Sequence, residues 1–207
     1  MTKWQQNWSN APTTFSLGSG YLDSVLSSIN SSLGYRLYFG LKTPSDISTL
    51  TLLMTPIDAN GNDVFSGSTE NPVTELTPSG NTAISGANAA TYTQNWRNHF
   101  GVDQQTDTLN CTGEGVCGQL SGGDKLVVPL AQTYSKRSTF AYLYESGISS
   151  GNNGTIELKM ALPEILSPIY EIDVYVTTPS NQKVLDFSRP CPKGCGQGNN
   201  LNGEASN

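Results

Sequence analysis

Residues 34–65, GYRLYFGLKTPSDISTLTLLMTPIDANGNDVF, form the segment that decides the fold. Apolar side chains alternate along its first part at Tyr35, Leu37 and Phe39, and a second apolar run follows at residues 50–54. This alternation is typical of strands with one apolar face. A turn sequence, DANGND, then leads into a short return strand. The segment therefore predicts an antiparallel meander with one apolar face.

Two amphipathic segments flank this meander, at residues 21–33 and 85–100. Their apolar residues are spaced three and four apart, as in a helix that buries one side. Gly34 is placed to end the first helix, while Ser85 and Gly101 are placed to begin and end the second. Because a sheet cannot leave its apolar face in water, we expect these helices to cover it. The outer side of the second helix is expected to carry Gln94, Asn95, Arg97 and Asn98.

The remaining chain predicts strands separated by polar loops. Residues 66–82 are rich in Ser, Thr, Pro and Gly, and residues 102–123 are polar and contain several glycines; both compositions are typical of loops. Alternating apolar residues between Gly- and Asn-rich turns predict five strands, at residues 125–130, 138–144, 155–162, 170–177 and 184–187. The fold class expected is therefore α+β, with a predominantly antiparallel sheet covered by two short helices and long polar loops.

The chain is expected to divide into an N-terminal arm (1–16), one α+β domain (17–195) and a mobile tail (196–207). The segments LTLLMTPIDANGNDVFS and IDVYVTTPSNQKVLDFS echo one another, which leaves open two related halves at about 17–66 and 83–195. The arm carries Trp4, Trp8 and Phe15. These aromatic residues either dock on their own domain or interact with a neighbouring copy.

The composition limits the classes of partner. Charged residues make up 14% of the 207 residues and the net charge is −6, so the surface is largely uncharged and polar. Lys and Arg are scattered, which disfavours nucleic acid, and no apolar run is long enough to cross a membrane. The start of the chain has no signal-peptide core, which predicts a cytoplasmic location. An extracellular location follows instead if the chain is a mature form or leaves by a non-Sec route.

Four cysteines offer a possible metal site, and they occur as two pairs, Cys111 with Cys117 and Cys191 with Cys195. Two such pairs can hold zinc, although neither has the usual CxxC spacing. Disulfides or free thiols are equally compatible with the pattern. Zinc is therefore the one cofactor considered, and otherwise none is expected.

The sequence offers few catalytic groups. His99 is the only histidine, and its place at a helix end favours a surface or capping role. The acids Glu171 and Asp173 fall on one face of a predicted strand, where solvation is the ordinary outcome. Asp58, Asn60 and Asn62 have the opening rhythm of a calcium loop, but a type I′ turn at Asn60–Gly61 explains this stretch better. The chain is expected not to be an enzyme.

Patches of the sequence resemble an uncharacterised protein family of Bacteroidota. The patches are GYRLYFGL, DANGND, ISGANAATYTQNWR and DFSRPCPKGC. The matching motifs are Gly-x-Arg-x-Tyr-x-Gly, Asp-x-x-Gly-Asn-Asp and a C-terminal Cys-Pro-x-x-Cys. The resemblance implies no activity.

Two hypotheses about function follow. The first is a non-enzymatic structural or interaction protein that self-assembles, as a homo-oligomer or with another protein, through exposed strand edges and the arm. The alternative is a small-ligand or glycan-binding module in which exposed Trp4, Trp8 or Trp96 stack on sugar rings.

Overall fold

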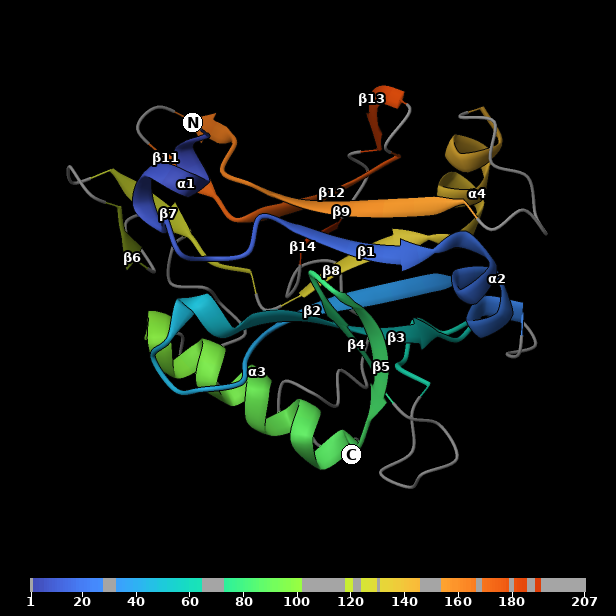
Figure 1. Cartoon of the computed structure of the whole chain (residues 1–207), viewed down its shortest axis with the longest axis horizontal. Helices are drawn as coiled ribbons and strands as arrows, with labels where there is room; N and C mark the ends of the chain where they lie inside the picture. Colours follow the sequence, from blue (N-terminus) through green and yellow to red (C-terminus); the bar gives the residue numbers. More distant parts are fainter. Residues whose placement is uncertain are drawn as a thin grey trace.

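The computed structural model describes residues 2–27, 33–64, 73–101, 118–120, 124–129, 131–145, 154–166, 169–178, 181–185 and 189–190. Within these ranges the chain forms three β-sheets and four α-helices, arranged as two main layers with helices around them (Figure 1). All described strand pairs are antiparallel except β11 with β7. The expected α+β class with predominantly antiparallel sheet is confirmed.

The lower layer of Figure 1 is a six-stranded sheet with strand order β14-β8-β2-β3-β4-β5. Its central strand, β2, pairs along its full length with β3 and over five residues with β8. The bounds of the strands, in sheet order, are Arg189–Pro190 (β14), Ala131–Ser135 (β8), Gly34–Leu41 (β2), Leu50–Ile57 (β3), Val73–Thr77 (β4) and Gly80–Ile84 (β5).

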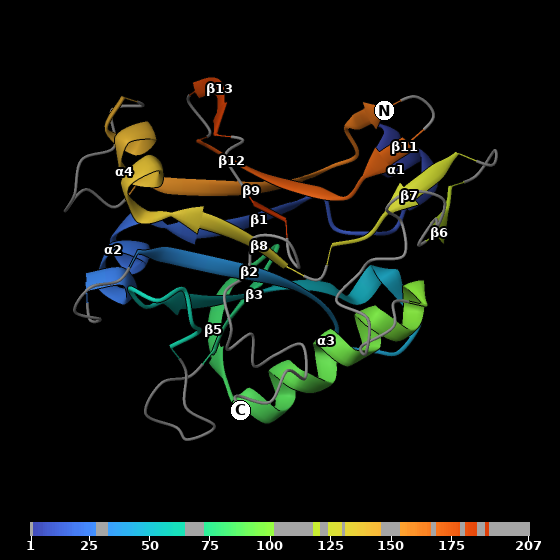
Figure 2. The same ribbon diagram turned by 180° about the vertical axis from the view of Figure 1, so that it is seen from behind.

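The upper layer is a four-stranded sheet with order β1-β9-β12-β13. Its strands are Thr14–Gly18 (β1), Thr155–Ala161 (β9), Asp173–Thr178 (β12) and Asn181–Leu185 (β13). A third, small sheet lies at one end of the two layers (Figure 2). It has the order β10-β11-β7-β6, with strands Glu164–Leu166 (β10), Ile169–Glu171 (β11), Lys125–Val127 (β7) and Gly118–Gln119 (β6).

The helices lie around the two layers. A short 3-10 helix, η1 (Ile47–Thr49), precedes β3. Figures 1 and 2 show α3 below the lower layer, α1 at the end that carries the small sheet, and α2 and α4 at the opposite end. The α-helices span Lys3–Asn7 (α1), Ser19–Ser27 (α2), Gly86–Phe100 (α3) and Lys136–Glu145 (α4).

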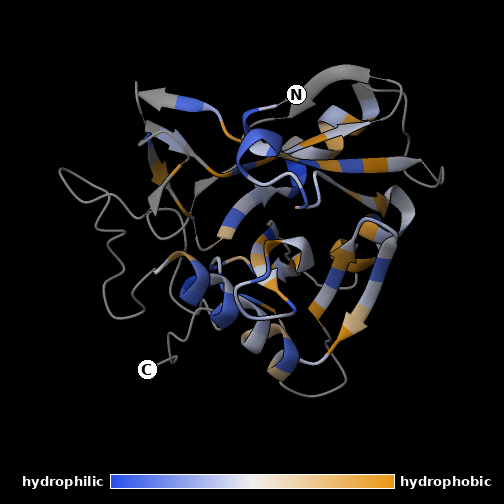
Figure 3. Ribbon diagram, turned by 60° about the vertical axis from the view of Figure 1, so that its left-hand side comes forward, coloured by the Kyte–Doolittle hydropathy of each residue, from blue (hydrophilic) through white to orange (hydrophobic). Residues whose placement is uncertain are grey.

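The main core lies between the two layers. Tyr35, Leu37 and Phe39 of β2 face Leu158 of β9 and Val174 of β12 across it, and all five belong to one buried cluster. Along β9 the apolar residues are buried and the polar ones between them are more exposed. Figure 3 shows this alternation as bands of orange and blue along the strands. The face of β2 that carries Tyr35, Leu37 and Phe39 is thus sealed mainly by a second sheet, so the expectation that both helices cover this face is wrong; α3 instead covers the opposite face of the same sheet.

The other face of β2 is buried as well, so the prediction of a single apolar face is also wrong. Tyr38, Leu53 and Ala89 form a second cluster between the lower sheet and α3. Gly40 permits this packing, because a Cβ there would lie 2.9 Å from the Cβ of Tyr92 on α3. β2 is therefore a central strand buried on both sides.

The second predicted helix is confirmed as α3. The Ser85 hydroxyl accepts a hydrogen bond from the Asn88 N–H, and Gly101 ends the helix in the left-handed conformation with φ 66°. Its outer side differs from the prediction in two places, because Asn95 and Arg97 are buried. Asn95 Nδ2 donates to the carbonyl of Leu41 at 2.9 Å, which ties the helix to the end of β2.

The first predicted helix is confirmed only in part. α2 ends at Ser27, residues 28–32 lie outside the described ranges, and Leu33 is 53% exposed. Gly34 begins β2 instead of capping a helix. Its φ is not left-handed. Glycine is needed at position 34 because a Cβ there would lie 1.9 Å from the carbonyl oxygen of Tyr134.

The strand predicted at residues 138–144 is wrong, since these residues belong to α4. Phe140, Tyr142 and Tyr144 repeat every second residue, which suggested a strand. In the helix Tyr142 and Leu143 are buried together, while Tyr144 is 77% exposed. Helical spacing therefore governs which side chains of this segment reach the core.

The loop predicted at residues 66–82 is also wrong for the part that the structure describes. Residues 73–84 form the hairpin of β4 and β5, with Pro78 and Ser79 at its turn. β4, and not a return strand after Asp63, is the second partner of β3. Asp63 makes only an isolated bridge with Ile57.

The N-terminal arm is part of the domain. α1 begins with a capping box between Thr2 and Gln5, and β1 starts at Thr14 within the predicted arm. β1 pairs with β9 at the edge of the upper sheet. The boundary predicted at residue 16 thus falls inside a strand. The predicted tail, 196–207, lies outside the described residues.

Candidate functional site

The most elaborate polar cluster in the described residues joins two of the sequence motifs. Arg36 Nη1 donates to Asp63 Oδ1 at 2.5 Å, and Arg36 Nη2 donates to the Gly61 carbonyl at 2.9 Å. The Tyr38 hydroxyl donates to the other carboxylate oxygen of Asp63. The side chains of Arg36 and Asp63 are 1% and 0% exposed. Gly-x-Arg-x-Tyr and Gly-Asn-Asp therefore meet as one buried network.

The electrostatics of this network favour a structural role. Burial and the neighbouring Asp63 carboxylate raise the pKa of Tyr38 well above its ordinary value, so the phenol stays protonated and acts as donor. The Nε of Arg36 also donates to the Thr133 hydroxyl at 3.3 Å. A charge pair closed off from water in this way has no face left for a substrate. We assign the network to holding the 58–64 turn against β2.

The turn at residues 58–63 is built on Asp58. Oδ1 of Asp58 accepts hydrogen bonds from the N–H groups of Asn62 and Asn60, at 2.9 and 2.8 Å. These hydrogen bonds, from Asn62 first, lower the pKa of Asp58. Gly61 has a φ of 82°, whereas Asn60 has no positive φ, so the predicted type I′ turn is wrong. The Asp58 carboxylate therefore stabilises the turn by accepting hydrogen bonds from the backbone N–H groups within it.

A second polar network lies between the two layers. Gln132 Nε2 donates to Asp173 Oδ1 at 2.5 Å, and the Val174 N–H donates to Gln132 Oε1 at 2.9 Å. The Tyr134 hydroxyl donates to the Val174 carbonyl, and its ring stacks on Tyr35 with centroids 5.1 Å apart. Asp173 is buried, so the expectation that this acid is solvated is wrong. The network joins β8 of the lower layer to β12 of the upper one.

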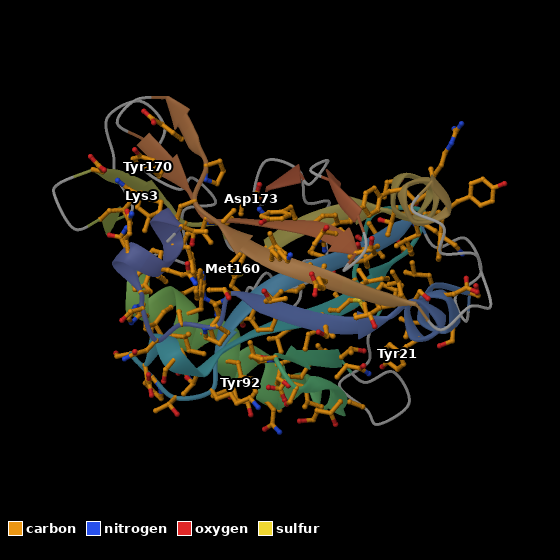
Figure 4. All side chains as sticks on the ribbon, turned by 45° about the horizontal axis from the view of Figure 1, so that its top comes forward. Lys3, Tyr21, Tyr92, Met160, Tyr170 and Asp173 are labelled. Carbon is orange, nitrogen blue, oxygen red and sulfur yellow. The ribbon has the colours of Figure 1, made fainter. Side chains whose placement is uncertain are left out.

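A third cluster fixes α1. Lys3 Nζ lies 2.6 Å from Asp124 Oδ2 and 4.4 Å from the centre of the Tyr170 ring. Figure 4 shows Lys3 and Tyr170 side by side at the end of the molecule that carries the small sheet. The hydrogen bond to Asp124 raises the pKa of Lys3. The cluster attaches α1 to the small sheet.

The aromatic residues proposed for interaction are taken up by the chain itself. Trp4 and Phe15 are 0% exposed and belong to the main core. Trp8 packs on Trp4, with ring centroids 4.6 Å apart, and edge-on against Phe100. The structure favours docking of the arm on its own domain. Since Trp4 and Trp96 are both buried, neither offers a ring for stacking on a sugar.

The remaining predicted groups do not assemble into a reactive site in the described ranges. His99 makes an edge-on contact with the ring of Phe100, and partial burial lowers its pKa. Cys111, Cys117, Cys191 and Cys195 all lie outside the described residues. Among the residues described, no three His, Cys, Asp or Glu side chains gather as they would around a metal ion.

The edge of the lower sheet at β5 is a different kind of candidate. β5 pairs with β4 on one side, and no described strand pairs with it on the other. Its sequence, GNTAI, has no charged residue and no proline, and Asn81, Thr82 and Ala83 are exposed. Sequence reasoning missed this strand, although the Pro78–Ser79 turn between two Thr-containing runs was a usable signal.

An open pocket of about 580 Å³ adjoins this hairpin. It lies between the β4–β5 turn, the η1 segment and Pro12, and the Lys42–Glu75 ion pair forms part of its wall. The described surface thus offers a strand edge and a neighbouring pocket.

Comparisons with protein-family models, curated proteins and solved structures found no match to this chain. No helix in the described part of the chain has the length and apolar character needed to span a membrane.

Proposed function

We propose that this chain is a non-enzymatic structural or interaction protein that assembles with further copies of itself through the free edge of β5. The observation that carries the proposal is the exposed and uncharged edge of this strand, which pairs with no described strand other than β4. Soluble proteins usually protect such edges with charges, proline or a covering element. β5 has neither charge nor proline, so the strand itself carries neither of the residue types that usually keep another strand from such an edge.

The pairing within the hairpin supports this assignment, because it sets which backbone groups of β5 are free. The carbonyl of Leu76 faces β3, since it accepts a hydrogen bond from the Thr51 hydroxyl at 2.7 Å. Asn81 lies opposite Leu76, so its N–H and C=O point away from β4. The same holds for Ala83, two residues further on. Two residues of β5 therefore present free donors and acceptors.

These groups are self-complementary about a two-fold axis through Thr82. If two copies of β5 pair in antiparallel fashion, Asn81 of each copy lies opposite Ala83 of the other, as a hydrogen-bonded pair. Thr82 then lies opposite Thr82, a favourable cross-strand pair. A two-fold interface of this kind closes as a dimer and joins the two lower sheets into one.

The chemistry of the described residues supports a non-enzymatic role. The most buried charged groups, Arg36 and Asp63, neutralise each other away from solvent. His99 contacts an aromatic ring. The low charged fraction, 14%, is consistent with a surface that associates with its own copies.

Replacing Ala83 by proline tests the proposal. The wild type is expected to be a dimer, and Ala83→Pro is expected to weaken dimerisation by about tenfold or more, because each copy loses an outward donor and gains a ring at the edge. Sedimentation equilibrium over a range of concentrations measures the change. The N–H removed does not bond to β4, so the hairpin is retained, and circular dichroism checks this.

Introducing a charge at Thr82 tests whether the two copies of β5 pair about a two-fold axis through this residue. Thr82→Lys and Thr82→Glu are each expected to weaken self-association by about fivefold, since like charges would lie opposite each other across the axis. An equal mixture of the two is expected to dimerise again. Thr91→Lys, at an exposed position on α3, is the matched control and leaves dimerisation unchanged. A monomeric wild type, or variants that all dimerise equally, would contradict the proposal.

A further inference from the structure

The pocket beside the β4–β5 hairpin is built from four separate parts of the chain. Pro12 comes from the segment before β1, Lys42 follows the end of β2, and residues 48–50 belong to η1 and the start of β3, while the hairpin supplies the rest of the wall. Its volume, about 580 Å³, lies within the range of small-molecule sites in proteins. The pocket therefore has room for a ligand of a few dozen atoms at most.

One wall of the pocket carries a fixed ion pair. Glu75 Oε1 lies 2.7 Å from Lys42 Nζ and 3.1 Å from the Thr51 hydroxyl, whose single proton it shares with the Leu76 carbonyl. The Glu75 side chain is 4% exposed, whereas that of Lys42 is 42% exposed. Both contacts fall on Oε1, which leaves the lone pairs of Oε2 for a ligand. The ammonium group of Lys42 likewise has further protons to donate.

The charges on this wall select among ligand classes. The Glu75 carboxylate repels a phosphate or carboxylate ligand, and the Lys42 ammonium group repels a cationic ligand. The pair as a whole therefore attracts neither anions nor cations. A neutral ligand meets an acceptor and a donor side by side. Adjacent hydroxyl groups match this arrangement, because one can donate to a carboxylate while its neighbour accepts from an ammonium group.

The rest of the lining has the same character. Among the residues that line the pocket are five with hydroxyl groups, and Asn81 adds an amide that can both donate and accept. The apolar part consists of Pro12, Leu50 and Pro78, with no aromatic ring. Such a surface hydrogen-bonds a polyol around its rim and offers only small apolar patches to its C–H groups. Weak binding is the consequence.

We propose that this pocket binds a neutral, polyhydroxylated small molecule of the monosaccharide class. Glu75 accepts hydrogen bonds from the ligand's hydroxyl groups and Lys42 donates to them. The proposal goes beyond self-assembly, because the ion pair lies within one chain; Asn81 and Thr82 line the pocket and also belong to the proposed dimer edge, so the ion-pair variants below test ligand binding separately from assembly. It also places ligand binding away from the buried tryptophans.

The test is to add small-molecule probes stepwise to the isotope-labelled protein and to monitor its amide signals by nuclear magnetic resonance. Glucose, galactose and N-acetylglucosamine are the sugar probes, and inorganic phosphate and acetate are the anion probes. At least one sugar is expected to shift the amide signals of Lys42 and of the hairpin residues 80–82 to saturation, while the anions leave them in place. Shifts by no sugar, or by the anions alone, would overturn the proposal.

Two variants assign the binding to the ion pair. Glu75→Gln and Lys42→Met are each expected to weaken sugar binding by about tenfold, since each removes one charge-assisted contact. Lys159→Met is the matched control, because Lys159 is paired with Glu157 at 3.0 Å on the other layer. Should Glu75→Gln not fold, Lys42→Met decides alone, since its side chain is partly exposed. Unchanged affinity in Lys42→Met would overturn the assignment.

Discussion

Replacing Asp63 by alanine is expected to lower the free energy of unfolding by about 3–5 kcal/mol, because it leaves the Arg36 charge buried without its partner. Arg36 and Asp63 are 2.5 Å apart, and their side chains are 1% and 0% exposed. The Tyr38 hydroxyl loses its acceptor in the same variant. Denaturant unfolding, followed by the signals of the buried tryptophans, measures the change.

Two further variants show whether the loss comes from the unpaired charge. Glu157→Ala removes the acid of a partly exposed ion pair with Lys159 and is expected to cost about 0.5 kcal/mol or less. The double variant Arg36→Met with Asp63→Asn removes both charges and keeps an acceptor for Tyr38. It should be more stable than Asp63→Ala alone. If Asp63→Ala unfolds like the wild type, the buried network does not stabilise this fold.

Replacing Gly34 by alanine is expected to cost about 2–3 kcal/mol, because the new methyl group has no space. Its Cβ would lie 1.9 Å from the carbonyl oxygen of Tyr134, and 3.0 Å from the N–H nitrogen of Lys136. Either β2 or β8 must move, and that movement breaks hydrogen bonds at the start of the pairing. Thermal unfolding of the variant beside the wild type gives the difference in stability.

Gly18→Ala is the matched control, since Gly18 also lies in a strand. The nearest atom to its added Cβ would be 4.0 Å away, an ordinary contact. We expect a change within about 0.5 kcal/mol. Equal effects at Gly18 and Gly34 would show that the loss at Gly34 does not come from the close approach of β8.

Local sequence signals were sufficient to predict helix α3. A capping serine, apolar residues at helical spacing and a final glycine all act within a few residues of one another, so the sequence alone placed this helix from Ser85 to Gly101. The same reasoning failed for α4. Its aromatic residues fit a two-residue period as well as a helical one, and packing against the core decided between them.

The motifs could be recognised before their role could be understood. Arg36 and Tyr38 alternate with Tyr35 and Leu37, and alternation alone suggested that they face water. In the structure they face Asp63, which lies 27 residues after Arg36. A polar side chain can be buried when a partner of opposite charge meets it, and that meeting depends on how the chain turns at residues 58–63.

What the sequence determined by itself is the α+β class, the antiparallel pairing of β2 with β3, and the helix that follows Ser85. These depend on periodicity and capping, which are properties of neighbouring residues. Only the tertiary structure decided that β2 is buried on both faces, that Gly34 makes room for β8, and that β5 ends the sheet with a free edge. Each of these depends on contacts between residues far apart in the chain, and no local pattern records which distant segment fills a given space.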